Sequence, residues 1–194
     1  MDKILREEAY YYYLRTIARD DTVGLLKARM SKDGGAAVWH GTRLASIDDE
    51  AINYAETVWP KYYSSSGTSH TGFKKAWPSI WYHTKLQPSN FNLAIWQTVN
   101  GIDVLQGMAA GKTSDGKKHL SLNWVERNFG PEYHRFGILV PVLMCFERYA
   151  ELLGCDRALI KNPVDPSKYS RYGYNLFNVR KSVTTFMAKE FPNG

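Results

Sequence analysis

The chain has 194 residues, of which 44% are apolar, 14% aromatic and 23% charged. This composition excludes a globally disordered chain, which is poorer in apolar residues and richer in charge, and no apolar run reaches the ~20 residues that a membrane-spanning helix needs. With 25 basic and 19 acidic residues the formal charge is +6, which is compatible with nucleic acid, anionic lipid or phosphorylated small molecules as partners. The length predicts an ordinary domain with a substantial hydrophobic core.

The first residues carry charges where a signal peptide requires an apolar stretch, so we expect no export. The two cysteines, Cys145 and Cys155, cannot form a disulfide scaffold, and no Cys/His spacing is that of a zinc site. We therefore expect a protein of the reducing cytoplasm that holds no metal.

Residues 2–19 are predicted to form an amphipathic helix, because apolar residues recur there at helical spacing: Ile4, Leu5, Ala9, Tyr12, Tyr13 and Ile17. Four consecutive tyrosines at 10–13 are too bulky to be buried on every side, so some of the rings must remain at the surface or contact a partner. We expect residues 1–35 to form an N-terminal helical extension and residues 36–194 to form the main domain.

The segment before the sheet contains weaker signals. A break at 32–35 is followed by a short apolar run at 36–39, and the capping signal at 46–49 predicts a helix that Pro60 terminates. Two tryptophans and two prolines within 61–88 indicate a short helix or an ordered aromatic loop.

From residue 91 the apolar residues alternate with a period of two, as in strands. Residues 91–99 and 102–108 are predicted strands joined by Asn100 and Gly101, a strong hairpin signal, and after a turn at 112–117 a third strand follows at 119–125. These segments predict an antiparallel meander.

The second half alternates between helix and strand. A connection at 128–137 leads to a helix at 138–153 that Gly154 caps, and then to a strand at 157–161, a brief helix and a terminal hairpin with its last strand at 182–188. This order predicts a mixed α/β fold, mostly antiparallel, with one parallel strand–helix–strand crossover.

The junction between the third strand and the long helix is a candidate anion site. A helix N-terminus presents unpaired backbone N–H groups and the positive end of the helix dipole to one point. Gly137 permits close approach of a ligand to the backbone, and Pro141 is acceptable only in the first helical turn. Most junctions of this kind bind nothing, so the geometry alone leaves the question open.

Two motifs here resemble those of the GNAT (general-control-related) N-acetyltransferases. Residues 129–138, Phe-Gly-Pro-Glu-Tyr-His-Arg-Phe-Gly-Ile, resemble the family's coenzyme loop, in which Pro-Glu-Tyr precedes Arg/Gln-x-x-Gly-x-Gly/Ala at the start of a helix. Asn162, Tyr169 and Gly173-Tyr174 resemble the family's Asn…Tyr-x-x-x-Gly-Phe pattern. The resemblance covers about residues 90–190 and more weakly 36–59. It implies a GNAT-like sheet flanked by helices and the direct transfer of an acetyl group from acetyl-CoA to an amine, on a small molecule or a protein.

The resemblance also implies roles for individual residues. The end of the third strand (Trp124, Val125 and onward to Phe129) would contact the pantetheine arm, and the following loop and helical turn would hold the pyrophosphate: His134, Arg135, Phe136, Gly137, Ile138 and Leu139. Asn162 would contact the coenzyme or an ordered water, and Tyr169 would protonate the departing thiolate. Glu126 is the candidate base for the acceptor amine, with an exposed strand carboxylate as the alternative.

Three loop positions depart from the family pattern. His134 occupies the Arg/Gln position, Arg135 a glycine position and Leu139 the final Gly/Ala position. Leu139 places a branched side chain where the helix should come nearest to a phosphate, whereas His134 and Arg135 could donate to the phosphate directly. Either the coenzyme is held differently or the fold has lost it.

This divergence leaves a second hypothesis, a catalytically inactive GNAT-fold protein that binds other proteins through its tyrosine-rich helix. Short versions with a divergent loop resemble phage-encoded chains, either virion components or proteins that act on targets in the infected host cytoplasm. A third reading is nucleic-acid binding through residues 161–181, where five basic residues face one acidic residue; it is the weakest of the three, and no membrane partner is expected.

Overall fold

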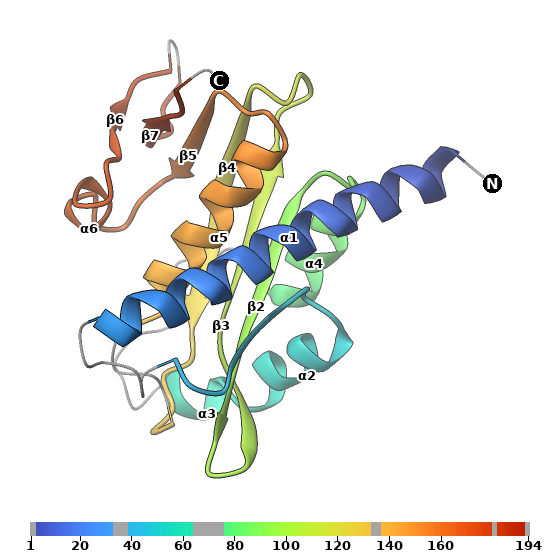
Figure 1. The fold of residues 1–194 in the computed structure, drawn as a ribbon, viewed down its shortest axis with the longest axis vertical. Coiled ribbons are helices and arrows are strands. Elements are labelled where there is room, and N and C mark those ends of the chain that lie inside the picture. Colours follow the sequence, from blue (N-terminus) through green and yellow to red (C-terminus); the bar gives the residue numbers. More distant parts are fainter. Residues whose placement is uncertain (1–2, 33–38, 64–75, 133–136, 180–181, 193–194) are drawn as a thin grey trace.

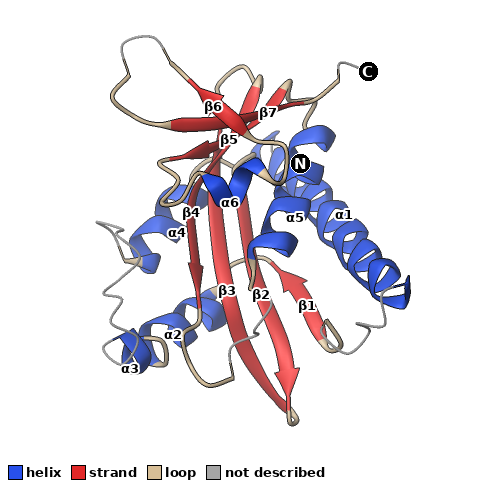
Figure 2. Ribbon diagram, turned by 90° about the vertical axis from the view of Figure 1, so that its left-hand side faces the viewer, coloured by secondary structure: helices blue, strands red, loops and turns tan. Residues whose placement is uncertain are grey.

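The computed structural model describes residues 3–32, 39–63, 76–132, 137–179 and 182–192. A seven-stranded sheet in the order β1-β2-β3-β4-β5-β7-β6 forms the centre, with helices on both faces (Figure 1, Figure 2). The strands are β1 (Thr42–Ala45), β2 (Phe91–Val99), β3 (Ile102–Thr113), β4 (His119–Arg127), β5 (Arg157–Lys161), β6 (Asn175–Phe177) and β7 (Phe186–Glu190). The helices are α1 (Lys3–Lys32), α2 (Asp49–Thr57), α3 (Pro60–Tyr63), α4 (Trp77–Lys85), α5 (Leu139–Leu152) and α6 (Ser167–Ser170). Among the described residues, no helix combines the length and the apolar character needed to cross a bilayer.

The predicted meander is confirmed, since β2, β3 and β4 pair in antiparallel register. Asn100 and Gly101 both have positive φ, 51° and 80°, which a tight type I′ hairpin turn requires at both central positions. β3 and β4 each extend beyond the predicted ends, to Thr113 and Arg127. Pairing between neighbouring strands therefore carries the sheet past the point where the apolar alternation fades.

The parallel crossover is confirmed as well. β4 pairs with β5 in parallel from His119↔Arg157 to Leu122↔Ile160, and α5 connects the two strands. Gly154, with φ +73°, follows α5 as the predicted left-handed cap. Pro141 is the third residue of α5, where its missing N–H would have had no acceptor within the helix.

The two faces of the sheet hold two separate cores, because successive strand residues point to opposite sides. Leu93 and Ile95 of β2 pack in the core beneath α1 and α5. Ala94 and Trp96, their alternating neighbours, pack in the core beneath α2, α3 and α4. On β4, Leu120, Leu122 and Val125 pack with the first core and Trp124 with the second.

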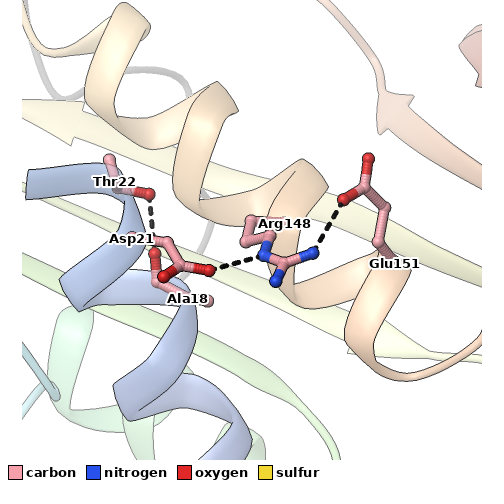
Figure 3. Close-up of polar contacts among 5 residues, drawn as sticks. All are labelled: Ala18, Asp21, Thr22, Arg148 and Glu151. Carbon is pink, nitrogen blue, oxygen red and sulfur yellow. Dashed lines mark hydrogen bonds and ion pairs between the residues drawn. The ribbon is translucent and has the colours of Figure 1, made fainter. Parts of the chain in front are cut away.

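α1 is longer than predicted and buries a different face. The helix continues to Lys32 instead of ending near residue 19, and its buried residues include Tyr11, Leu14 and Ala18. The predicted apolar face is wrong, since Leu5 is 56% exposed. The physical reason is tertiary: α1 packs across α5, and Arg148 of α5 donates to Asp21 of α1 at 2.7 Å (Figure 3).

The four tyrosines of α1 separate as expected. Tyr11 is 8% exposed, whereas Tyr10, Tyr12 and Tyr13 are 54%, 58% and 63% exposed. Successive helix positions are rotated by about 100°, so with Tyr11 facing the core the other three rings point away from it and remain at the surface. The expectation that some of the run stays at the surface is confirmed.

Three boundaries in the rest of the chain differ from prediction. The first strand is β1, from Thr42, and of the apolar run at 36–39 only residue 39 lies among the described residues. Asp48 caps α2 by accepting from the Ala51 N–H at 2.9 Å, and Pro60 opens α3 as well as following α2. The last strand, predicted at 182–188, is Phe186–Glu190, because its limits are set by pairing with β5 and β6.

Candidate functional site

The parallel pair β4–β5 opens halfway along β4. The β3–β4 register steps from Gly111↔Leu122 to Ala110↔Trp124, so Asn123 is an extra residue in β4 and forms a bulge. Bulges bend and twist the strand that carries them. The pairing with β5 ends at Leu122, while the pairing with β3 continues to Arg127. Along residues 123–127, the edge of β4 that faces away from β3 is therefore not paired with β5.

β5 turns away at the same level. Asn162 follows β5 with φ 49° and donates its backbone N–H to the Thr185 carbonyl at 2.8 Å. Asparagine is one of the few residues that adopt positive φ readily, so the backbone conformation alone is a reason for an asparagine at this position. The side chain is exposed. The structure places Asn162 where β5 leaves the sheet, just past the level at which β4 and β5 part.

The chain that leaves β4 is anchored by buried polar groups. Asn128 donates its backbone N–H to the Gln106 carbonyl at 2.8 Å and accepts from the Gly130 N–H at 2.7 Å. The Gln106 amide donates to the Glu132 carbonyl at 3.0 Å. Gln106 is itself the extra residue of a bulge in β3. Sequence reasoning missed this residue, because no local pattern marks a buried glutamine that holds a distant loop.

α5 begins directly behind the opened edge. Gly137 has φ +74°, a left-handed conformation that favours glycine, and among the described residues no side chain caps the N-terminus of α5, whose first turn contains no acidic residue. The backbone N–H groups at this terminus have no acceptor within the helix. The predicted loop residues His134, Arg135 and Phe136 lie outside the described residues.

The first side chains of α5 pack inward. Ile138 is 5% exposed and lies over Gly107 of β3, where a β-carbon would come within 2.4 Å of its Cδ1. Leu139 is partly buried against the core beneath α1 and α5. The branched side chain that departs from the family pattern thus has an apolar surface to cover.

Glu126 is a buried carboxylate held by two hydrogen bonds. It is 2% exposed, so the alternative of an exposed strand carboxylate is wrong. Tyr63 donates its hydroxyl to Oε1 at 2.7 Å, and the indole N–H of Trp77 donates to Oε2 at 2.6 Å. Both donors come from the helical layer on one face, α3 and α4. Two charge-assisted bonds of this length stabilise an anion far from water.

Tyr63 connects this carboxylate to the loop after β4. Burial, and secondarily the hydrogen bond to Glu126, raises the pKa of Tyr63 well above its ordinary value. Its ring meets Phe129 edge-on at 6.1 Å between centroids, and the Arg127 guanidinium lies over the same phenyl ring at 4.7 Å. Tyr63 and Trp77 were not predicted as site residues. The one sequence feature that could have indicated them is the high aromatic content of residues 61–88.

Tyr169 lies on α6, the short helix that follows β5. Its ring is partly buried against the core beneath α1 and α5 and meets Tyr174 edge-on at 6.4 Å. Burial, followed by the nearby Asp165 charge, raises the pKa of Tyr169, which keeps the phenol protonated at neutral pH. Its hydroxyl makes no hydrogen bond within the described part of the chain.

The predicted residues are distributed around the opening between β4 and β5. Glu126 faces α3 and α4, whereas Val125, its neighbour in the alternation, packs against the core beneath α1 and α5, as Tyr169 does. Trp124 is partly buried against the core beneath α2–α4, and Lys112 lies over its ring at 5.8 Å. The Glu126 carboxylate and the Tyr169 phenol thus lie on opposite faces of the sheet.

No family model matches the sequence, and no curated protein matches it. Similar solved structures do exist. Ard1 from Thermoplasma volcanium aligns with a TM-score of 0.53 at 13% identity, covering 77% of this chain and 97% of its own. The ribosomal-protein-S18-alanine N-acetyltransferase from Escherichia coli gives 0.53 at 14%, covering 77% and 93%. A putative acetyltransferase from Salmonella typhimurium with its cofactor acetyl-CoA, yncA, gives 0.51 at 12%, covering 79% and 96%. At such identities the likeness establishes the fold.

Proposed function

We propose that this chain, which has the GNAT fold, is an acetyl-CoA-dependent N-acyltransferase that transfers an acetyl group directly to an amine. The observation that carries the proposal is the opening of the β4–β5 pair at the Asn123 bulge, with the uncapped N-terminus of α5 behind it. An unpaired strand edge and a helix N-terminus together suit an extended ligand that carries amides at one end and phosphates at the other.

The residues present fit the coenzyme. The opened edge of β4, from Trp124 toward Phe129, offers backbone groups to the pantetheine amides, and the amides of Gly137, Ile138 and Leu139 offer donors to the pyrophosphate. His134 and Arg135 add two side chains that can donate to phosphate. Asn162, which follows β5 at the divergence of β4 and β5, would contact the coenzyme. When bound, acetyl-CoA supplies an activated thioester.

Two side chains supply the acid–base chemistry. Glu126 accepts a proton from the acceptor amine, directly or through water, so that the amine attacks in its neutral form. Tyr169 donates its phenolic proton to the sulfur as the bond between carbon and sulfur breaks. The raised pKa of Tyr169 supports this assignment, because the group must enter the reaction protonated.

A calorimetric titration with acetyl-CoA tests the binding step, and the chain offers a matched pair of variants. Gly137 and Gly154 have nearly equal φ, +74° and +73°, at opposite ends of α5. Alanine at either position imposes the same backbone strain, about 1 kcal/mol. Gly137→Ala should weaken binding strongly and Gly154→Ala should leave it unchanged. Equal affinity of both variants, or no heat from the wild type at millimolar acetyl-CoA, would refute the proposed coenzyme site.

Release of free thiol from acetyl-CoA in the presence of a panel of amines tests the transfer step. We expect release that depends on an added amine and that increases with pH until the amine is neutral. Wild-type protein that binds the coenzyme but releases no thiol with any amine, small or peptidic, would favour a binding protein of this fold over an enzyme.

A further inference from the structure

Arg19 of α1 is a buried cation that has no carboxylate partner among the described residues. It is 5% exposed, and its two guanidinium bonds go to neutral hydroxyls: Nη1 donates to Ser46 Oγ at 2.7 Å and Nη2 donates to Thr16 Oγ1 at 3.0 Å. The Tyr12 ring lies 5.7 Å from the guanidinium carbon. Within the described residues no carboxylate oxygen lies within 4.0 Å of this side chain.

Such an arrangement is unfavourable for the protein alone, because a buried charge normally requires an opposite charge to offset its desolvation. Burial lowers the pKa of Arg19, an effect that the nearby Asp20 charge only partly opposes. The neighbouring Arg148 shows the ordinary solution. Its side chain is 40% exposed, yet it pairs with Asp21 at 2.7 Å and with Glu151 at 3.3 Å (Figure 3). The more exposed arginine has two carboxylate partners, and the buried one has none.

Arg19 borders a cavity of about 310 Å³ between α1 and the segment that joins β1 to α2. At ~30 Å³ for each water, this space can hold a small organic molecule. The two hydroxyl bonds use two of the five guanidinium N–H groups. The cavity is lined by Tyr12, Thr16, Arg19, Asp20, Leu44, Ala45, Ser46 and Asp48.

The charges around the cavity define the complementary ligand. Asp20 and Asp48 are exposed and line the same cavity as the buried Arg19, and Asp48 also caps α2. A dianionic phosphate would bind Arg19 but would be repelled by the two carboxylates. A ligand with one carboxylate and an adjacent ammonium satisfies all three charges, because the anion meets Arg19 and the cation meets the outer carboxylates.

We propose that this cavity binds a small zwitterion of the amino-acid class, with its carboxylate on Arg19 and its ammonium toward Asp20 and Asp48. The ligand bridges α1 to the start of α2 and supplies the anion that Arg19 lacks. The site lies at the β1 edge of the sheet, apart from the opening between β4 and β5, and it is independent of the proposed acyl transfer.

The test is an NMR titration of the full chain, without coenzyme, against three probes. L-alanine carries both charges, acetate only the anion and ethylamine only the cation. We expect saturable shifts around Arg19 and Ser46 with L-alanine, at least about tenfold weaker binding of acetate, and none of ethylamine. Inorganic phosphate should bind no better than acetate. Binding of phosphate or acetate as tight as that of L-alanine, or no saturation by L-alanine, would overturn the proposal.

Two variants and a control locate the site. Arg19→Met keeps the apolar stem and removes the charge, so it should abolish L-alanine binding while leaving the ligand-free chain as stable or more stable. Asp20→Asn, at an exposed position, should weaken L-alanine but not acetate. Arg148→Met removes the paired arginine and should change neither. Retained binding in Arg19→Met, or an unchanged preference for L-alanine in Asp20→Asn, would contradict the assignment.

Discussion

The hydrogen bond between Tyr63 and Glu126 should contribute measurably to stability, and Tyr63→Phe isolates it. The variant removes one hydroxyl, which donates to a carboxylate that is 2% exposed at 2.7 Å. A hydrogen bond to a charged group contributes about 1.5–3 kcal/mol, against about 0.5–1.5 kcal/mol for a neutral pair. The variant should therefore lower the free energy of unfolding by about 2 kcal/mol.

A double-mutant cycle measures how much the negative charge of Glu126 adds to the strength of this hydrogen bond. In a Glu126→Gln background the same loss of hydroxyl should lower the free energy of unfolding by only about 1 kcal/mol, because the remaining pair is neutral. Urea denaturation gives the free energy of unfolding of the wild type, the two single variants and the double variant, provided that the dependence on urea concentration has the same slope in all four. Tyr82→Phe, at a tyrosine that is 54% exposed, is the control and should stay within about 0.5 kcal/mol of wild type.

The result that refutes this reasoning is an equal loss in both backgrounds, since it would mean that Glu126 does not act on Tyr63 as an anion. The same variants separate stability from catalysis. Glu126→Gln should reduce acetyl transfer by about 10²–10⁴-fold, the usual contribution of a general base. Tyr63→Phe keeps the carboxylate and should reduce transfer far less.

Three further predictions concern other parts of the molecule. At Gly107 an added β-carbon would lie 2.8 Å from the Glu126 carbonyl oxygen, whereas at Gly24 nothing lies within 4 Å. Thermal unfolding should therefore show Gly107→Ala destabilised by about 1–3 kcal/mol and Gly24→Ala stabilised by about 0.5–1 kcal/mol. A Gly107→Ala variant as stable as the wild type would contradict the packing of β3 on β4. Tyr169→Phe should reduce turnover by ~10²-fold with little change in acetyl-CoA affinity, and unchanged turnover would remove Tyr169 from the mechanism. Burial raises the pKa of the Cys145 thiol from 9.0 to about 12, so the stability that the protonated thiol contributes is complete below pH 9 and is lost as the pH rises toward 12. At pH 8 a thiol reagent should modify Cys145 only as fast as the chain unfolds. Rapid labelling of the native protein would show instead that Cys145 is accessible.

The sequence determined the elements whose signal is local. The alternation at 91–99, the Asn100–Gly101 turn and the short apolar strand at 157–161 each predict one conformation, and β2 and β5 have the predicted bounds. Gly154 closes α5 as predicted. A turn dipeptide or a period of two constrains the backbone through nearest neighbours, so these features need no knowledge of the partner strand.

Part of the candidate site was also present in the sequence, because its position follows from the order of elements. A strand, a loop with Gly137 and a helix place unpaired amides at one point in any fold that contains them. The GNAT resemblance added the roles that we propose for Asn162 and Tyr169. The identity of the residues that surround Glu126 was absent, since Tyr63 and Trp77 are separated from it by 63 and 49 positions.

The tertiary structure alone decided the face that each residue buries. α1 buries Tyr11 and Leu14 instead of Leu5, because α5 lies on that side and Arg148 pairs with Asp21 across the contact. Glu126 is buried because the donors on α3 and α4 offset the cost of desolvating its charge. Arg19 is buried against neutral hydroxyls beside a cavity, and no carboxylate of the described segments pairs with it. Burial of a charge depends on what the rest of the chain brings to it, and the sequence around the residue does not contain that information.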